Sequence, residues 1–104
     1  APGRNNPARI TYGPNTCKPG LVWREADDWD WVCVAPPIRQ QTRNDNAQAA
    51  ARREPGGGPY GPDTCRQGFV WREAFPGDHV CVTPLTRSQA SDDNQHAQER
   101  LLEM

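Results

Sequence analysis

Two apolar runs separated by a turn signal stand out in the second half of the chain. Residues 69–71 and 80–82 are rich in valine and aromatic side chains, and the sequence FPGD lies between them at 75–78. Short runs of this kind around a Pro-Gly turn are typical of two antiparallel strands. The pattern therefore predicts a β-hairpin over residues 69–83.

Side chains alternate between the two faces of a hairpin, so the position of the turn fixes which residues share a face. With Pro76 and Gly77 at the centre of the turn, Trp71 lies opposite Val82. The predicted inner face is apolar and carries Phe69, Trp71, Val80 and Val82. The predicted outer face carries Val70, Arg72, Ala74, His79 and Cys81. A single bulge would reverse these faces.

The sequence after the hairpin changes to a helical pattern. Thr83 is a favourable N-cap, Pro84 suits the first helical position, and good helix formers continue to Leu102. This pattern predicts a helix of about four to five turns.

The whole pattern occurs twice. Each landmark recurs 48 residues later without a gap, so that Cys17 corresponds to Cys65 and Cys33 to Cys81. The two copies are identical at about half of their aligned positions. In the first copy, Ala35 is a poorer cap than Thr83.

The repeat gives the expected domain organisation. We expect an α+β fold of two tandem small modules, residues 12–53 and 60–104, each a disulfide-closed β-hairpin followed by an α-helix. A Pro/Gly linker at residues 54–59 joins the modules. Residues 1–11 are predicted to be a flexible lead.

Four cysteines without the CxxC or histidine-rich spacing of a zinc site favour two disulfides in an oxidising compartment. Each repeat should be able to close itself, which favours Cys17 with Cys33 and Cys65 with Cys81. Pairing between the repeats, Cys17 with Cys65 and Cys33 with Cys81, is the alternative. Each loop closed within a repeat would contribute about 3 kcal/mol of stability.

Charge and hydropathy narrow the function classes. The formal net charge is −1 and no basic run is present, which argues against a nucleic-acid partner. No apolar segment approaches the roughly 20 residues of a membrane-spanning helix, so no membrane insertion is expected. The chain begins without methionine, as a mature secreted chain does. We therefore expect a secreted or cell-envelope location.

The residues that recur on the two predicted helices are mainly polar. They share a stripe at helical spacing and comprise Arg39, Asp45, Asn46, Ala49 and Arg52, with Arg87, Asp93, Asn94, Ala97 and Arg100 in the second copy. Asp and Asn inside a helix suggest hydrogen bonds to a neighbouring backbone or to an arginine, with Arg24 and Arg72 as candidates. Plain polarity of an exposed helix face is the alternative explanation.

Catalytic and metal sites are poorly supported. Glu25 with Asp30, and Glu73 with Asp78, are carboxylate pairs of the kind a glycosidase uses, but a small hairpin offers no cleft around them. The acidic stretch at 26–30 is too short for a calcium loop. We expect no catalytic activity, no metal and no cofactor.

Trp29 and Trp31 are the candidate binding residues. They alternate along the predicted strand, so both side chains point to one side, next to Arg24. Exposed indoles beside a guanidinium can stack on a sugar ring or anchor a protein partner. In the second copy, Arg72 and His79 correspond to Arg24 and Trp31. Packing between the modules is the alternative use of these residues.

The second copy follows the pattern GPDTCxxGFVWREAxxxDxVCVTPxxR, and the first departs from it at ADDWDW and at Ala35. This pattern resembles a tandem repeat module of uncharacterised secreted proteins of actinobacteria and other soil bacteria. The resemblance implies secretion and a modular build, and it assigns no catalytic or binding residues.

The sequence thus predicts a secreted, non-catalytic binding module that is a monomer or weak dimer. Its expected partner is a surface glycan or an extracellular protein. One alternative is a disulfide-stapled inhibitor or toxin-like effector that acts through the hairpin tips at 27–30 and 75–78. The other is a structural envelope protein without a ligand site.

Overall fold

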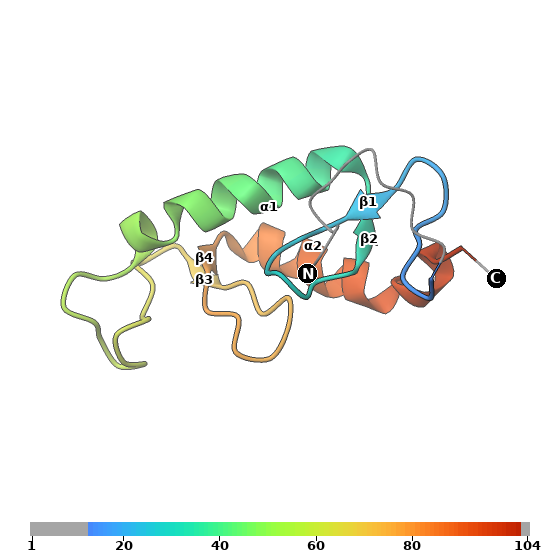
Figure 1. Ribbon diagram of the computed structural model, residues 1–104. Coiled ribbons are helices and arrows are strands. Elements are labelled where there is room, and N and C mark those ends of the chain that lie inside the picture. The colour runs from blue at the N-terminus through green and yellow to red at the C-terminus, as the bar shows by residue number, and fades with distance from the viewer. Residues whose placement is uncertain (1–12, 103–104) are drawn as a thin grey trace. The chain divides into compact units, whose positions relative to one another are not determined.

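A computed structural model describes residues 13–102 of the chain (Figure 1). The lead predicted at residues 1–11 lies outside the described residues. Strand, strand, α-helix and 3-10 helix follow each other twice along the chain. The elements are β1 Val22–Trp23, β2 Cys33–Val34, α1 Pro36–Gln48, η1 Ala50–Arg52, β3 Val70–Trp71, β4 Cys81–Val82, α2 Pro84–Gln95 and η2 Gln98–Arg100. The α+β fold of two hairpins, each followed by a helix, is confirmed.

Each hairpin is closed by its own disulfide. Cys17 bonds to Cys33 and Cys65 bonds to Cys81, and none of the four cysteines is free. The predicted pairing is confirmed, and pairing between the repeats is excluded. Two disulfides are typical of an oxidising, extracellular compartment. Within residues 13–102, none of the helices is long and apolar enough to cross a membrane.

The predicted register of the hairpins is wrong by one residue. Trp71 pairs with Cys81 rather than with Val82, and Val70 takes the place opposite Val82. Strands β1 and β2 pair in the corresponding register.

A bulge causes the shift. The turn lies where the sequence predicts it, since the N–H of Asp78 donates to the carbonyl of Phe75 at 3.0 Å. On the strands, the N–H of Arg72 donates to the carbonyl of Val80 at 2.8 Å, which leaves one more residue on the first strand than on the second. Glu73 lies in this bulge with φ 53°, and the same position in the first repeat has φ 59°. A residue with positive φ is typical of such an insertion.

Because of the bulge, one arginine side chain points into the interior of each hairpin. Arg24 and Arg72 are each only 2% exposed, beside the fully buried Val34 and Val82. The tryptophan predicted for this inner position in the second repeat, Trp71, is half-buried instead. The expectation that Arg24 lies on the outer face is therefore wrong, because the bulge reverses the alternation.

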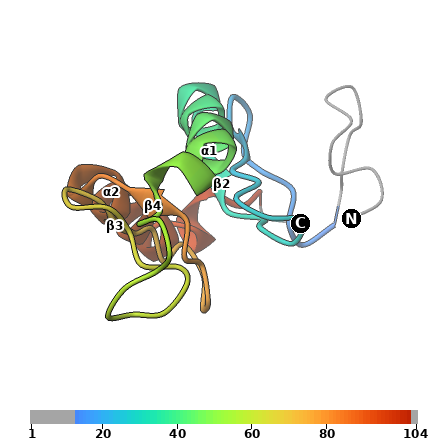
Figure 2. The same cartoon turned by 90° about the vertical axis from the view of Figure 1, so that its left-hand side faces the viewer.

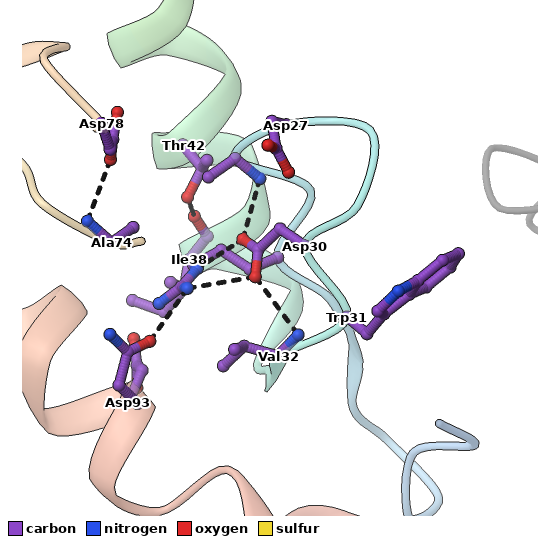
Figure 3. Close-up of polar contacts among 12 residues, drawn as sticks. Asp27, Asp30, Trp31, Val32, Ile38, Thr42, Ala74, Asp78 and Asp93 are labelled. Atoms are coloured by element: carbon purple, nitrogen blue, oxygen red, sulfur yellow. Dashed lines mark hydrogen bonds and ion pairs between the residues drawn. The ribbon is translucent and has the colours of Figure 1, made fainter. Parts of the chain in front are cut away.

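Each buried arginine is held by an aspartate across the hairpin turn. In the first repeat Nε and Nη2 of Arg24 donate to the two carboxylate oxygens of Asp30 at 2.6 and 3.1 Å (Figure 3). Asp30 also accepts the backbone N–H groups of Ala26 at 2.9 Å and of Val32 at 3.3 Å. We call this pair, with its counterpart in the second repeat, the arginine anchor. It joins the two strands and fixes the loop between them.

The second repeat has the same anchor. Nε and Nη2 of Arg72 donate to Asp78 at 2.7 and 3.1 Å. The N–H groups of Ala74 and Val80 donate to the same carboxylate at 3.0 and 3.4 Å. The anchor is thus a property of the repeated sequence and does not depend on the differing residues of the two loops.

The chain forms two compact units that do not coincide with the sequence repeats. Unit 2 is Asn44–Asp92, and unit 1 takes in the described residues through Arg43 together with those from Asp93 onward. The boundaries between the units therefore fall within α1 and within α2. Each unit contains one hairpin, the first part of the helix that follows it, and the end of the other helix.

We call the two helix ends, residues 93–102 in unit 1 and residues 44–54 in unit 2, the closing segments. In unit 1, Nη2 of Arg24 donates to the side chain of Asn94 at 3.0 Å. Arg100 donates to Asp93 at 2.9 Å and to the carbonyl of Cys33 at 3.1 Å. The closing segment is thus bonded both to the buried arginine and to the disulfide-bonded strand.

The same bonds hold the closing segment of unit 2. Arg72 donates to Asn46 at 2.9 Å, while Arg52 donates to Asp45 at 2.9 Å and to the carbonyl of Cys81 at 3.1 Å. Hydrogen bonds between the polar stripe and Arg24 or Arg72 are therefore confirmed. The helices end earlier than predicted, and the 3-10 turns η1 and η2 continue them to these arginines.

The predicted Pro/Gly linker is an ordered loop of unit 2. The N–H of Glu54 donates to the carbonyl of Thr64 at 2.8 Å, and Gly58 and Gly61 exchange two backbone bonds of 3.1 and 3.0 Å. In Figures 1 and 2 this loop follows the end of α1 in yellow-green. Gly57 has φ 81°, and a Cβ there would lie 2.9 Å from the carbonyl oxygen of Gly61.

The arginine anchor predicts that two carboxylates of one hairpin contribute very differently to the free energy of unfolding. Asp78→Asn should lower the free energy of unfolding by about 3 kcal/mol, because it leaves the buried guanidinium without its charged partner. Glu73→Gln should lower it by less than about 1 kcal/mol, since the pair of Glu73 with Arg87 is half exposed. Urea unfolding followed by tryptophan fluorescence measures both. Equal losses would contradict the anchor.

The ordered loop predicts that alanine substitutions at two neighbouring glycines lower the free energy of unfolding by different amounts. Gly56→Ala meets open space and should cost about 1 kcal/mol for its positive φ alone. Gly57→Ala has the same φ penalty and must also displace the backbone at Gly61, so we expect it to cost at least about 1 kcal/mol more. Urea unfolding with intact disulfides compares the two variants. If both lose the same stability, the loop is not held as described.

Candidate ligand-binding site

The loop between β1 and β2 is fixed by its own aspartates. The backbone N–H of Trp29 donates to Oδ1 of Asp27 at 2.9 Å, and the N–H of Asp30 donates to the carbonyl of Asp27 at 3.3 Å. The carboxylate of Asp30 holds the N–H groups on either side of the loop, at Ala26 and Val32. These bonds limit the backbone freedom of the residue at the tip, Trp29.

Three tryptophans of unit 1 form a cluster that ends at the surface. The rings of Trp23 and Trp31 lie edge to face with centroids 4.5 Å apart, and those of Trp31 and Trp29 do so at 6.4 Å. Nε1 of Trp23 donates to the carbonyl of Asn15 at 2.7 Å, which fixes the inner ring. Trp29 is 69% exposed. We call this cluster the tryptophan platform. In Figure 3 the side chain of Trp31 points away from the arginine anchor.

The equivalent position in unit 2 carries a different cluster. His79 stacks on Trp71 with centroids 3.8 Å apart, and Tyr60 contacts Trp71 edge to face at 5.9 Å. Asp63 holds both rings of the stack, since its carbonyl accepts Nε1 of Trp71 at 2.8 Å and its carboxylate lies 3.1 Å from Nδ1 of His79. The residue that corresponds to Trp29 is Gly77.

A pocket of about 300 Å³ opens beside this second cluster. It is mainly apolar and is lined by Tyr60, Thr64, Cys65, Phe69, Val70, Trp71 and Arg87. Arg87 forms an ion pair of 3.1 Å with Glu73. The volume of the pocket lies at the lower end of the range of ligand pockets, about 300 to 1,000 Å³. Neither Tyr60 nor Arg87 was assigned to a binding site from the sequence, although both positions are identical in the two repeats.

The structure brings together only part of the predicted site. The rings of Trp29 and Trp31 contact each other, although neither residue lies in the strand predicted for them from the sequence. The assignment of Arg24 and Arg72 to the ligand surface is wrong, because both guanidinium groups are buried in the arginine anchors. His79 is partly exposed and packs on Trp71.

The carboxylates that could form catalytic pairs all contact arginines. Asp30 and Asp78 accept hydrogen bonds within the arginine anchors. Glu25 is buried with its carboxylate 3.6 Å from Arg39 and 3.5 Å from Arg43. These contacts give the carboxylates a part in holding the hairpins. In the described part of the chain, no group of three or more His, Cys, Asp or Glu side chains could hold a metal ion.

The tryptophan platform is therefore an aromatic surface on a fixed loop, and the pocket is a small aromatic recess on the other unit. Comparison with protein-family models, with curated protein sequences and with solved structures found no match.

Proposed function

We propose that this protein is a secreted, non-catalytic binding protein that contacts a surface glycan through Trp29 and Trp31. The observation that carries the proposal is the 69% exposure of Trp29 on a loop whose backbone is held by Asp27 and Asp30. An indole of this size would gain roughly 2 kcal/mol or more from burial. A fixed loop that forgoes this gain is pre-organised to contact a ligand.

A sugar ring fits the chemistry of the platform. Its C–H face packs on an indole, and its hydroxyl groups need acceptors at the ring edge. Asp27 and Asp28 are exposed beside Trp29 in the sequence. Trp31 packs edge to face on Trp29 and limits the orientation of the outer ring.

The pocket of unit 2 supplies a second contact of the same kind. Tyr60, Phe69 and Trp71 give it aromatic walls, and Arg87 adds donors for a hydroxyl or carboxylate oxygen. A volume of about 300 Å³ accommodates one sugar ring better than a longer ligand.

The platform can be tested with one variant and a matched control. Trp29→Ala should weaken binding of the best ligand from a glycan array by at least about tenfold, which corresponds to about 1.4 kcal/mol. Leu85→Ala removes another highly exposed apolar side chain, 80% exposed, and should leave the affinity unchanged. Titration calorimetry measures both, and thermal unfolding should be the same for Trp29→Ala and the wild type.

Two results would contradict the proposal. One is a glycan array on which no sugar retains the protein. The other is an unchanged affinity in Trp29→Ala. A protein partner that is retained by the wild type and lost by Trp29→Ala would keep the platform and overturn the glycan as its ligand.

A further inference from the structure

The backbone bonds of the closing segments are equivalent in the two units. In unit 1, the N–H of Lys18 donates to the carbonyl of Arg100 at 3.0 Å, and the N–H of Leu102 donates to the carbonyl of Thr16 at 2.8 Å. The same two bonds in unit 2, both of 2.8 Å, join Arg66 to Arg52 and Glu54 to Thr64. A short β-bridge beside the first cysteine of each hairpin results, Cys17 with Leu101 and Cys65 with Arg53.

The side-chain bonds are equivalent as well. Each closing segment presents an asparagine to the buried arginine of a hairpin, and an arginine to the carbonyl of the second cysteine. The segments read DNAQAAAR and DNQHAQER, so the aspartate, the asparagine and the arginine have the same spacing in both. The aspartate of each segment, Asp45 or Asp93, is 2% exposed and holds that arginine.

We infer that each hairpin is a binding site for a helical segment of the form Asp-Asn, five residues, Arg, and that a second copy of this chain can supply it. The groups that receive the segment are backbone atoms beside the disulfide and one buried guanidinium. None of them distinguishes a segment of the same chain from that of another copy. Two chains that exchange residues 93–102 form a dimer with the bonds that unit 1 has in the monomer.

The exchange depends on concentration and on prior opening of unit 1. A segment on the same chain competes at an effective concentration of the order of millimolar. The segment must also leave its own hairpin, which breaks the bonds of Arg100 and of the β-bridge. Exchange therefore requires unfolding followed by refolding at roughly millimolar protein.

The full chain with intact disulfides provides the test. Equal amounts of ¹⁵N-labelled and unlabelled protein are unfolded together in guanidinium, refolded at about 1 mM or at about 10 µM, and separated by size. Native mass spectrometry of the millimolar sample should find dimers, about half of them of mixed mass. The micromolar sample should contain monomer, and mixing the two folded proteins without denaturant should give no mixed dimer.

A pair of variants distinguishes dimers that exchange residues 93–102 from dimers that associate through their outer surfaces. Arg100→Ala removes the bonds to Asp93 and Cys33, so its dimers should dissociate after dilution at least tenfold faster than those of the wild type. Gln98→Ala changes an exposed neighbour on η2 and should stay within twofold of the wild type. Absence of dimers at 1 mM, mixed dimers formed without unfolding, or equal dissociation rates of the two variants would each overturn the inference.

Discussion

A charged guanidinium group can be buried in so small a protein only where strong hydrogen-bond acceptors surround it. Arg24 finds one acceptor in its own hairpin, the carboxylate of Asp30, and another in the closing segment, the amide oxygen of Asn94. The arginine therefore joins three parts of unit 1, namely the strands, the loop between them and the end of a distant helix. Arg72 does the same in unit 2. With strands of two residues, the hairpins depend on this polar centre and on the disulfide more than on an apolar core.

The anchor also explains how the first loop can expose an aromatic side chain and remain ordered. The carboxylate that neutralises the arginine also accepts hydrogen bonds from the N–H groups at both ends of the loop. These bonds stabilise the loop conformation before any ligand binds. Under the proposed function, a ligand would meet a surface whose backbone has little conformational entropy left to lose. In the second repeat the same anchor carries Pro76 and Gly77 at the tip of the loop, and the aromatic cluster consists of Trp71, His79 and Tyr60.

Much of this architecture follows from the sequence. The repeat could be predicted from the recurring landmarks, the turn at 75–78 from its Pro-Gly pair, and the disulfide pairing from the expectation that each repeat closes itself. The register of the strands could not be predicted, because it depends on a positive φ at Glu73. A glycine or asparagine at this position would have indicated a positive φ, but a glutamate does not. The helix ends could not be assigned to a hairpin either, because Asn46 and Asn94 suit both buried arginines. The sequence left open whether Trp29 is exposed or packed between the modules, and it placed Arg24 on the outer face, although Arg24 is buried.

The division of each helix between the two units sets the smallest part of the chain that can fold. Because the end of one repeat's helix closes the hairpin of the other, a single repeat is not a complete folding unit. The two repeats complete each other, because each supplies the helix end that the hairpin of the other one needs. A fragment that contains one repeat alone would therefore have to complete its hairpin with the helix end of another molecule.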